Sequence, residues 1–144
     1  MQRTRPGEGS IGSLLYGASN AVRLQFTDSL REHGLDHDMY IMLQLIRVGG
    51  EAGADPVEGA TRMLMAKGAL IDAAERLVRD GWAKPISRAQ AASSRIVLTK
   101  MAVDRLPAVE SIGAFILGHA TNGFTNDELE TLAGYLQRII DNMA

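Results

Sequence analysis

The stretch from Asp55 to Thr99 constrains the fold of this chain more than any other. Asp55 followed by Pro56 predicts the start of a short helix, because Asp caps a first turn and Pro fits the first helical position. A longer helix follows and ends at Gly81, and residues 82–98 form two short apolar runs around a polar tip, a pattern typical of a β-hairpin. Helix, turn, helix and hairpin in this order predict a winged helix-turn-helix, a scaffold that lays its second helix in the DNA major groove.

The second of these helices has an apolar and a polar face. Residues on one face of a helix recur every three or four positions. On this spacing the inward residues are Leu70, Ala73, Ala74, Leu77 and Val78. The outward residues, which a DNA groove would meet, are Gly68, Ala69, Asp72, Glu75, Arg76 and Arg79. The wing strands are predicted at Trp82–Ser87 and Arg95–Leu98.

Apolar helices are predicted on both sides of this module. A stripe runs from Ser10 to about Glu32, Gly34 ends that helix, and Asp36 can cap a second one. Thr99 can cap a long fifth helix to about Thr121, in which Pro107 should cause a kink or delay the start.

A capping box of Thr125 and Glu128 opens the last helix, which carries an apolar stripe to the end of the chain. We therefore expect a mainly α fold with a small β-wing. Residues 1–9 are predicted to be a disordered tail and residues 10–144 a single domain. Within that domain the winged module spans about 36–99, with helices for dimerisation at about 10–33 and 100–144.

Charge is divided unevenly along the chain. Residues 56–105 hold nine basic and five acidic side chains, whereas the remainder holds six basic and twelve acidic ones, for a net charge of −2. A basic module on an acidic support favours contact with nucleic acid through that module.

Other function classes lack their characteristic residues. The 144-residue sequence contains no cysteine, no glycine-rich phosphate loop and no nucleophile elbow. His33 and His37 lie four residues apart, but Gly34 and Leu35 interrupt the helix, so we expect a surface or hinge pair rather than a metal site. No apolar run approaches the roughly 20 residues of a membrane helix. We expect a cytoplasmic protein that is not an enzyme, needs no cofactor or metal, and does not bind a membrane.

Four short motifs carry a family resemblance. They are His33-Gly34-Leu35 before the second helix, Arg76–Ala83 (RLVRDGWA), Leu98-Thr99 before the fifth helix, and Gly123–Leu129 (GFTNDEL) before the sixth. In this order and spacing the chain resembles the MarR (multiple antibiotic resistance regulator) family of bacterial transcription factors over nearly its whole length.

The resemblance implies a homodimer joined by the first, fifth and sixth helices. It also implies binding to a pseudo-palindromic operator in double-stranded DNA, often with release by a small aromatic or anionic effector. Two features differ from the family pattern. Its usual wing Asp-x-Arg corresponds to Gln90 and Ala92 here, and Lys67-Gly68-Ala69 with Asp72 occupies the region where its recognition helix shows Ser or Thr and Arg.

We therefore predict a DNA-binding transcriptional regulator that holds DNA mainly through charge and shape. The predicted DNA-binding residues are Lys67, Gly68, Ala69, Asp72, Arg76, Arg79, Lys84, Arg88 and Arg95. An effector pocket between the helical support and the reading module is predicted from Tyr16, His33, Met39 and Tyr40, which are apolar with a few polar tips. The alternative is a winged-helix dimer that binds a small ligand or a protein partner and has lost specific DNA reading.

Overall fold

The computed structural model describes residues 8–65, 67–86 and 95–144. Its α-helices are α1 (Glu8–Leu30), α2 (His37–Gly49), α3 (Pro56–Arg62), α4 (Lys67–Arg79), α5 (Lys100–Ala120) and α6 (Asn126–Met143). Two 3-10 turns, η1 (Arg31–His33) and η2 (Gly50–Ala52), flank α2. The two strands, β1 (Ala83–Pro85) and β2 (Ile96–Leu98), lie between α4 and α5. The order confirms the predicted mainly α fold with a β-wing.

Side-chain caps start the helices where the sequence places them. The caps are Asp36, which accepts from the Met39 amide at 2.9 Å, Asp55 from Val57 at 2.8 Å, Thr99 from Ala102 at 3.2 Å, and Thr125 from Glu128 at 3.1 Å. The last of these is a complete capping box, since Glu128 also accepts from the Thr125 amide. Each cap satisfies an amide that the first helical turn would otherwise leave unpaired.

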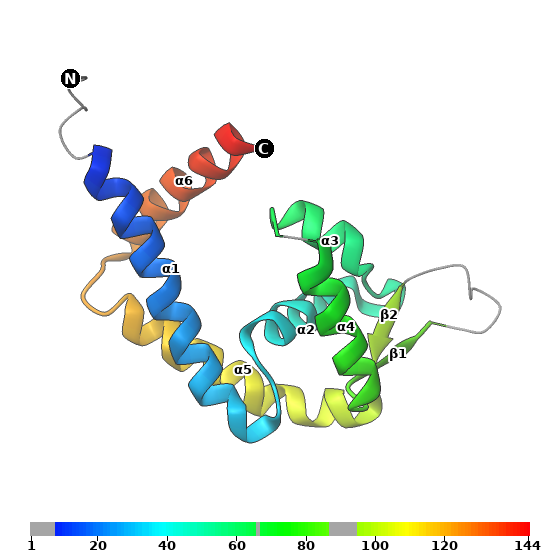
Figure 1. Ribbon diagram of the computed structural model, residues 1–144. Coiled ribbons are helices and arrows are strands. Elements are labelled where there is room, and N and C mark those ends of the chain that lie inside the picture. The colour runs from blue at the N-terminus through cyan, green and yellow to red at the C-terminus, as the bar shows by residue number, and fades with distance from the viewer. Residues whose placement is uncertain (1–7, 66, 87–94) are drawn as a thin grey trace.

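Boundaries differ from the prediction in α1 and in the wing, where β1 (Ala83–Pro85) and β2 (Ile96–Leu98) are shorter than the predicted strands at 82–87 and 95–98. Glu8 and Gly9, predicted to belong to the tail, begin α1, whereas residues 1–7 lie outside the described part of the chain. Helix α5 begins at Lys100 and runs through Pro107, so the proline does not delay its start. Figure 1 shows α5 changing direction along its length, as expected of a helix with an interior proline.

The core lies between α2 and α4 and extends to α1 and α5. Its largest fully buried side chains are Phe26, Leu30, Met39, Met42, Leu43, Ile46, Leu70, Leu77 and Val109. The wing joins this core through Trp82, Ala83 and Ile96, which are also buried. In the sheet Ala83 pairs with Leu98, Lys84 with Val97 and Pro85 with Ile96, in antiparallel register.

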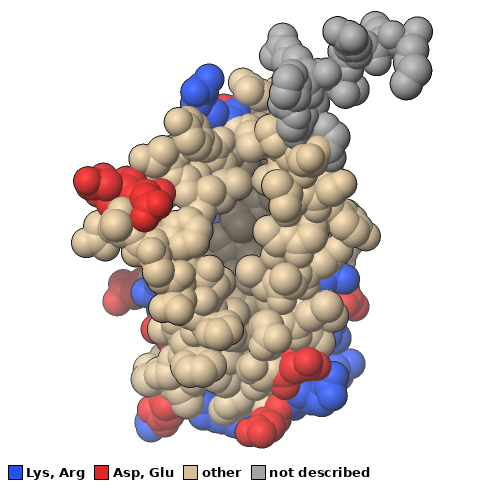
Figure 2. Space-filling model, turned by 90° about the vertical axis from the view of Figure 1, so that its left-hand side faces the viewer, with Lys and Arg blue, Asp and Glu red and all other residues tan. Residues whose placement is uncertain are grey.

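One side of the molecule is apolar and exposed. None of the residues of α6, all of which the structure describes, is buried. The exposed apolar residues that share one stripe on each of two helices are Ile11, Leu14 and Leu15 of α1 and Leu132, Tyr135, Leu136, Ile139, Ile140 and Met143 of α6; we call this set the apolar support face. Figure 2 shows the side of the molecule on which α1 and α6 lie, largely uncharged and hollowed near its centre. Among the helices described, none combines the length and apolar character needed to cross a membrane.

The turn between α3 and α4 contains a strained residue. Met65 donates to the carbonyl of Ala60 at 2.9 Å and Leu64 to that of Thr61 at 3.3 Å, the paired bonds of a Schellman helix ending. This ending needs a left-handed residue, and Leu64 takes that conformation with φ +53°, the only positive φ of a described residue other than glycine. At the matching ending of α4 the position belongs to Gly81, with φ +85°. A left-handed backbone costs a side-chain-bearing residue roughly 1–2 kcal/mol.

Leu64→Gly should therefore stabilise the fold. Leu64 is 51% exposed, so little apolar burial is lost. We expect the free energy of unfolding to rise by about 1 kcal/mol or less, because relief of strain outweighs the added freedom of glycine in the unfolded chain. Urea unfolding measures the change. Gly81→Ala is the matched control and should lower the free energy of unfolding. A lower free energy of unfolding in Leu64→Gly would contradict the conclusion that Leu64 is strained.

Candidate nucleic-acid interface

Helix α4 is the element that the sequence places in a DNA groove. Leu70, Ala73, Ala74 and Leu77 are buried, as predicted for its inward face. Val78 is not: it is 38% exposed, so its predicted inward placement is wrong. Val78 lies at the edge of the apolar stripe, between the buried face of Ala74 and the exposed flank that it shares with Ile71, and there the fold leaves it uncovered.

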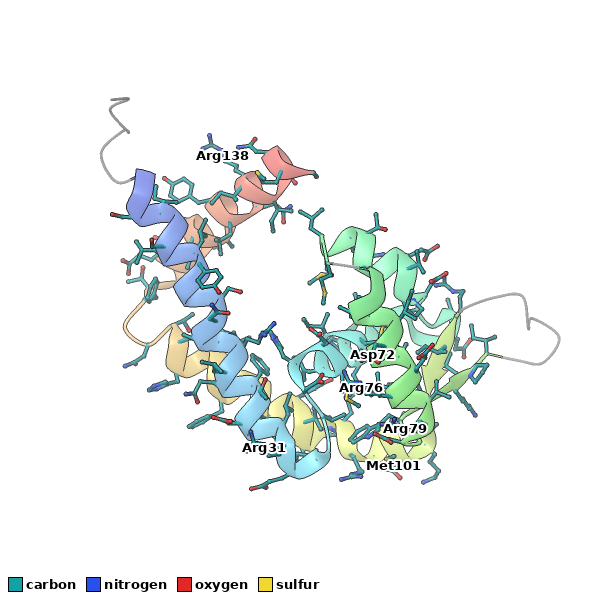
Figure 3. The ribbon with its side chains drawn as sticks, in the orientation of Figure 1. Arg31, Asp72, Arg76, Arg79, Met101 and Arg138 are labelled. Atoms are coloured by element: carbon teal, nitrogen blue, oxygen red, sulfur yellow. The ribbon has the colours of Figure 1, made fainter. Side chains whose placement is uncertain are left out.

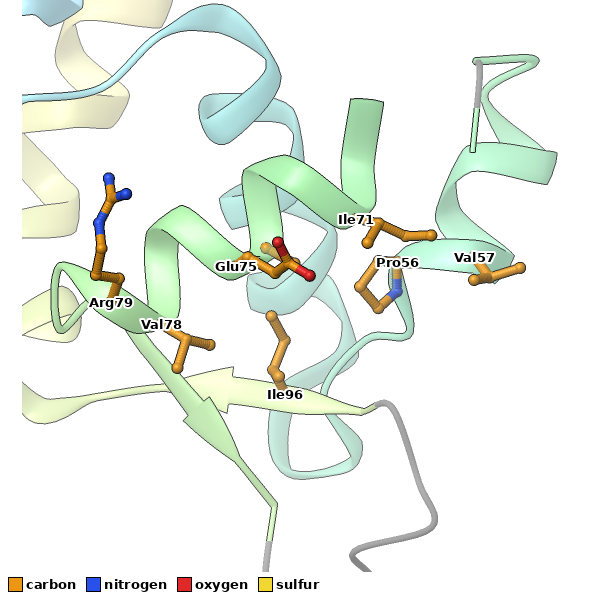
Figure 4. A pocket seen from close by; sticks show the side chains of 8 residues that line it. Pro56, Val57, Ile71, Glu75, Val78, Arg79 and Ile96 are labelled. Carbon is orange, nitrogen blue, oxygen red and sulfur yellow. The ribbon is translucent and has the colours of Figure 1, made fainter. Parts of the chain in front are cut away.

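This flank of α4 borders an apolar pocket. Pro56 and Val57 of α3, Ile71, Ala74 and Val78 of α4, and Ile96 of β2 line a cavity of about 490 Å³, with Glu75 and Arg79 at its polar edge. Figure 4 shows Pro56 of α3, Glu75 and Val78 of α4, and Ile96 of β2 around this space, whereas the guanidinium of Arg79 points away from it. Sequence reasoning missed this pocket, because three segments far apart in the chain form it.

The predicted outward residues of α4 have unequal exposure. Gly68, Asp72, Glu75 and Arg79 are exposed, whereas Ala69 and Arg76 are half-buried. Arg79 keeps 69% of its side chain exposed while its Nε donates to the neighbouring Asp80 at 3.2 Å. Figure 3 shows Asp72, Arg76 and Arg79 following one another along α4.

The remaining predicted DNA contacts lie in or beside α4 and the wing. Lys67 begins α4, and Lys84 is exposed on β1. Arg88, with the Gln90 and Ala92 of the altered wing pattern, lies outside the described residues. DNA contact by these residues stays a prediction.

Arg76 is held by two carboxylates. Its Nη1 donates to Asp36 at 2.6 Å, and its Nε donates to Asp72 at 3.0 Å. The hydrogen bond to Asp36, together with the charges of both carboxylates, raises the pKa of Arg76 above its ordinary value, although partial burial opposes this. Asp36 precedes Arg76 by 40 positions, so no local pattern could have predicted the pair.

Arg95 joins the wing to the loop before α3. Its guanidinium donates to the carbonyls of Ala52 at 2.8 Å and Gly53 at 3.1 Å, and to Glu58 at 3.1 Å. A backbone bridge between Ala54 and Ile96 lies beside these bonds. Arg95 therefore holds the base of the wing in place, and its predicted phosphate contact stays untested.

The four residues of the predicted effector pocket have different surroundings. Met39 is 1% exposed in the core, and Tyr16 is 75% exposed on α1. Tyr40 packs on Phe26 with ring centroids 4.9 Å apart, and its hydroxyl lies against Gly113 of α5. The Nδ1 atom of His33 is buried and has no hydrogen-bond partner among the described residues. A pocket lined by all four stays a prediction.

His37, the first residue of α2, packs against α1. Its ring stacks on Phe26 with centroids 4.6 Å apart and planes 13° from parallel. Burial between the helices lowers the pKa of His37 below its ordinary value of 6.5, and Arg23 lowers it further, whereas Asp38 and Asp36 oppose the change. The ring is therefore most compatible with the fold when neutral.

Comparison with known proteins identifies the fold. No family model matches the chain, and no curated protein matches its sequence. Among solved structures, a MarR transcriptional regulator from Methanosarcina mazei Go1 superposes with a TM-score of 0.78 at 17% identity, covering 94% of this chain and 95% of that one. MepR from S. aureus, solved in complex with DNA, superposes with a TM-score of 0.78 at 14% identity over 91% and 94%.

A mutant MarR from E. coli, complexed with operator DNA, gives a TM-score of 0.73 at 22% identity and covers 90% of this chain and 93% of that one. At these identities the similarity is one of fold. The chain therefore has the winged-helix fold of MarR-type regulators over nearly its full length.

The state of His37 predicts a pH dependence of stability. Because its pKa is lower in the folded than in the unfolded chain, protonation favours unfolding, so stability is full above about pH 6.5 and falls as the pH drops below that value. Urea unfolding at several pH values between about 5 and 8 measures this decline. His37→Gln should be less stable at neutral pH but lose this part of the pH dependence. An NMR titration placing the folded pKa of His37 at or above 6.5 would contradict the prediction.

Proposed function

We propose that this chain is a DNA-binding transcriptional regulator of the MarR type, acting as a homodimeric repressor on a pseudo-palindromic operator. The observation that carries the proposal is the match of nearly the whole chain to regulators solved on DNA, such as MepR of S. aureus and MarR of E. coli. In this fold α4 offers an exposed face next to a wing strand that carries Lys84. A helix with a flanking wing is the geometry by which winged proteins read DNA.

The apolar support face supports the dimer. Together with Phe115 of α5, which is 77% exposed, it leaves many large apolar side chains uncovered, and contiguous exposed apolar patches ordinarily mark interaction sites. A groove of about 480 Å³ between α1 and α5, lined by Val22, Leu24, Phe115 and Ile116, adds concave apolar surface. A second copy of this chain is the occupant proposed, because a two-fold dimer covers the same face on both copies at once and spaces two α4 helices for two half-sites.

The regulator is further proposed to release DNA when a small aromatic or anionic effector binds. The pocket of about 490 Å³ beside α4 supports an aromatic effector, because its wall is apolar, with Arg79 and Glu75 as the charged residues at its edge. An occupant there would lie next to the face proposed to read DNA.

A second candidate is a winged-helix dimer that binds a protein or small ligand and no longer reads DNA. The acidic groups on α4 favour it, because Asp72 and Glu75 are exposed where phosphates would approach. DNA binding at low salt decides between the two. A gel-shift with the DNA upstream of the protein's own gene is the direct experiment, and no shift of any duplex at low salt would leave the second candidate in place.

The dimer predicts a response to substitution on α6. Light scattering of the purified chain should give twice the mass of one chain at micromolar concentration. Leu136→Glu, which places a charge in the apolar support face, should shift the mass towards that of one chain. Gln137→Glu adds the same acid on the polar side of α6 and should leave the dimer intact. A wild-type chain that is monomeric at this concentration would contradict the dimer and the two-fold operator together.

The charge-based mode of binding predicts a particular salt dependence. Arg79→Ala and Lys84→Ala should each lower the slope of log K against log salt by roughly one unit and weaken operator and random DNA alike. Asp72→Ala should leave binding unchanged or tighten it, since a carboxylate is removed from a phosphate-facing surface. Fluorescence anisotropy at several salt concentrations measures both. If Asp72→Ala abolishes operator binding and spares random DNA, Asp72 reads a base directly.

A further inference from the structure

Asp36 makes two hydrogen bonds that connect two helices. Its Oδ1 accepts from the Met39 amide at 2.9 Å and so caps α2. Its Oδ2 accepts from the Nη1 of Arg76, in the last turn of α4, at 2.6 Å. One carboxylate therefore determines where α2 begins and also holds α4.

The guanidinium of Arg76 is occupied on two sides. Beside the bond to Asp36, its Nε donates to Asp72 at 3.0 Å, and its Nη1 lies 3.4 Å from the sulfur of the buried Met39. Only 29% of the Arg76 side chain is exposed, against 69% for Arg79. The planar fork of Arg suits such paired binding, which a point charge could not reproduce.

The charges around Arg76 oppose a role in phosphate binding. One guanidinium between two carboxylates leaves this group with a net negative charge. The bonds to Asp36 and Asp72 use Nη1 and Nε and so fix the direction of the guanidinium, which leaves Nη2 as the nitrogen that a phosphate could reach, beside two carboxylates that repel it. Breaking one partner from a part-buried ion pair is costlier than losing an exposed pair.

The same segment also contacts the helical support. His37 follows Asp36 directly and stacks on Phe26 of α1. Adjacent residues at the start of α2 therefore contact α1 on one side and α4 on the other. The orientation of α4 relative to the support is determined partly at this point.

We propose that Arg76 is a positioning residue, which orients α4 for DNA through its bond to Asp36 and does not itself bind a phosphate. The proposal rests on the proposed function. It replaces the expectation, drawn from the sequence, that Arg76 binds a DNA phosphate and so contributes to the salt dependence of DNA affinity.

The test uses four single variants and one double variant of the full chain. Asp36→Asn keeps the cap, since Asn caps a helix as well as Asp, but removes the charge that holds Arg76. Arg76→Gln removes the other partner, and the double variant keeps the net charge of the wild type. Asp72→Asn controls for the second carboxylate, and Arg79→Gln controls for an exposed arginine of the same helix.

DNA affinity and its salt slope, measured on the upstream DNA, are the first readout. Asp36→Asn and Arg76→Gln should each weaken binding by about fivefold with the slope unchanged, and the double variant should be no weaker than either, as expected of coupled residues. Arg79→Gln should lower the slope by roughly one unit, and Asp72→Asn should leave affinity within about twofold. A slope lowered by one in Arg76→Gln, with tighter binding in Asp36→Asn, would show a phosphate contact and overturn the proposal.

Urea unfolding of the same variants without DNA is the second readout. The loss of stability caused by Arg76→Gln should vanish when Asp36→Asn is already present. Coupling in unfolding together with unchanged DNA affinity would make the bond purely structural and overturn the positioning role, with the regulator function intact. A wild-type chain that binds no DNA would overturn both, and the unfolding cycle would then report only the bond itself.

Discussion

The packing of α4 against α2 is the contact on which the rest of the structure depends. Ala73 and Ala74 of α4 are buried and small, so the helix can approach its neighbours closely, while Leu70 and Leu77 fill the space on either side. Met39, Met42, Leu43 and Ile46 supply the facing surface of α2. Because this apolar contact fixes which side of α4 faces inward, it also decides which side chains remain on the outside.

Polar contacts at the ends of the module determine its orientation. At one end Asp36 holds Arg76, and at the other Arg95 holds the wing to the loop before α3. Both arginines bind groups some 40 residues away in the chain, within the same fold. A basic residue in a predicted DNA-binding module can therefore stabilise the geometry of that module, and charge counted along the sequence overstates the charge offered to phosphates. Arg79 and Lys84 remain exposed as the clearer candidates for that role.

The apolar support face lacks a covering partner within the described part of the chain. Helix α6 has a strong apolar stripe with no fully buried residue within the chain, so much of the free energy available from that stripe depends on an occupant outside it. A second copy would convert this surface into a core between chains and set the distance between two α4 helices. In that arrangement the support helices, the start of α2 and α4 form one connected structure, because His37 contacts α1 and Asp36 contacts α4.

Local chemistry in the sequence predicted most of the fold. The caps at Asp36, Asp55, Thr99 and Thr125, the apolar period of each helix, and the short strands around a polar tip depend on neighbours within a few residues, so the sequence determines them directly. The order of elements and the four motifs then identified the winged fold. Val78 was misplaced because it lies at the edge of the apolar stripe, where spacing alone does not separate burial from exposure.

Only the tertiary structure decided which outward residues are available. The bonds of Arg76 to Asp36 and of Arg95 to Ala52, Gly53 and Glu58 join positions far apart in the chain, and so does the apolar pocket between α3, α4 and β2. The left-handed Leu64 was also not predicted, since the helix ending at which it lies imposes a conformation that its own side chain disfavours. Sequence periodicity reports which face of a helix points outward, but the partners of a long polar side chain depend on which other segment the fold brings beside it.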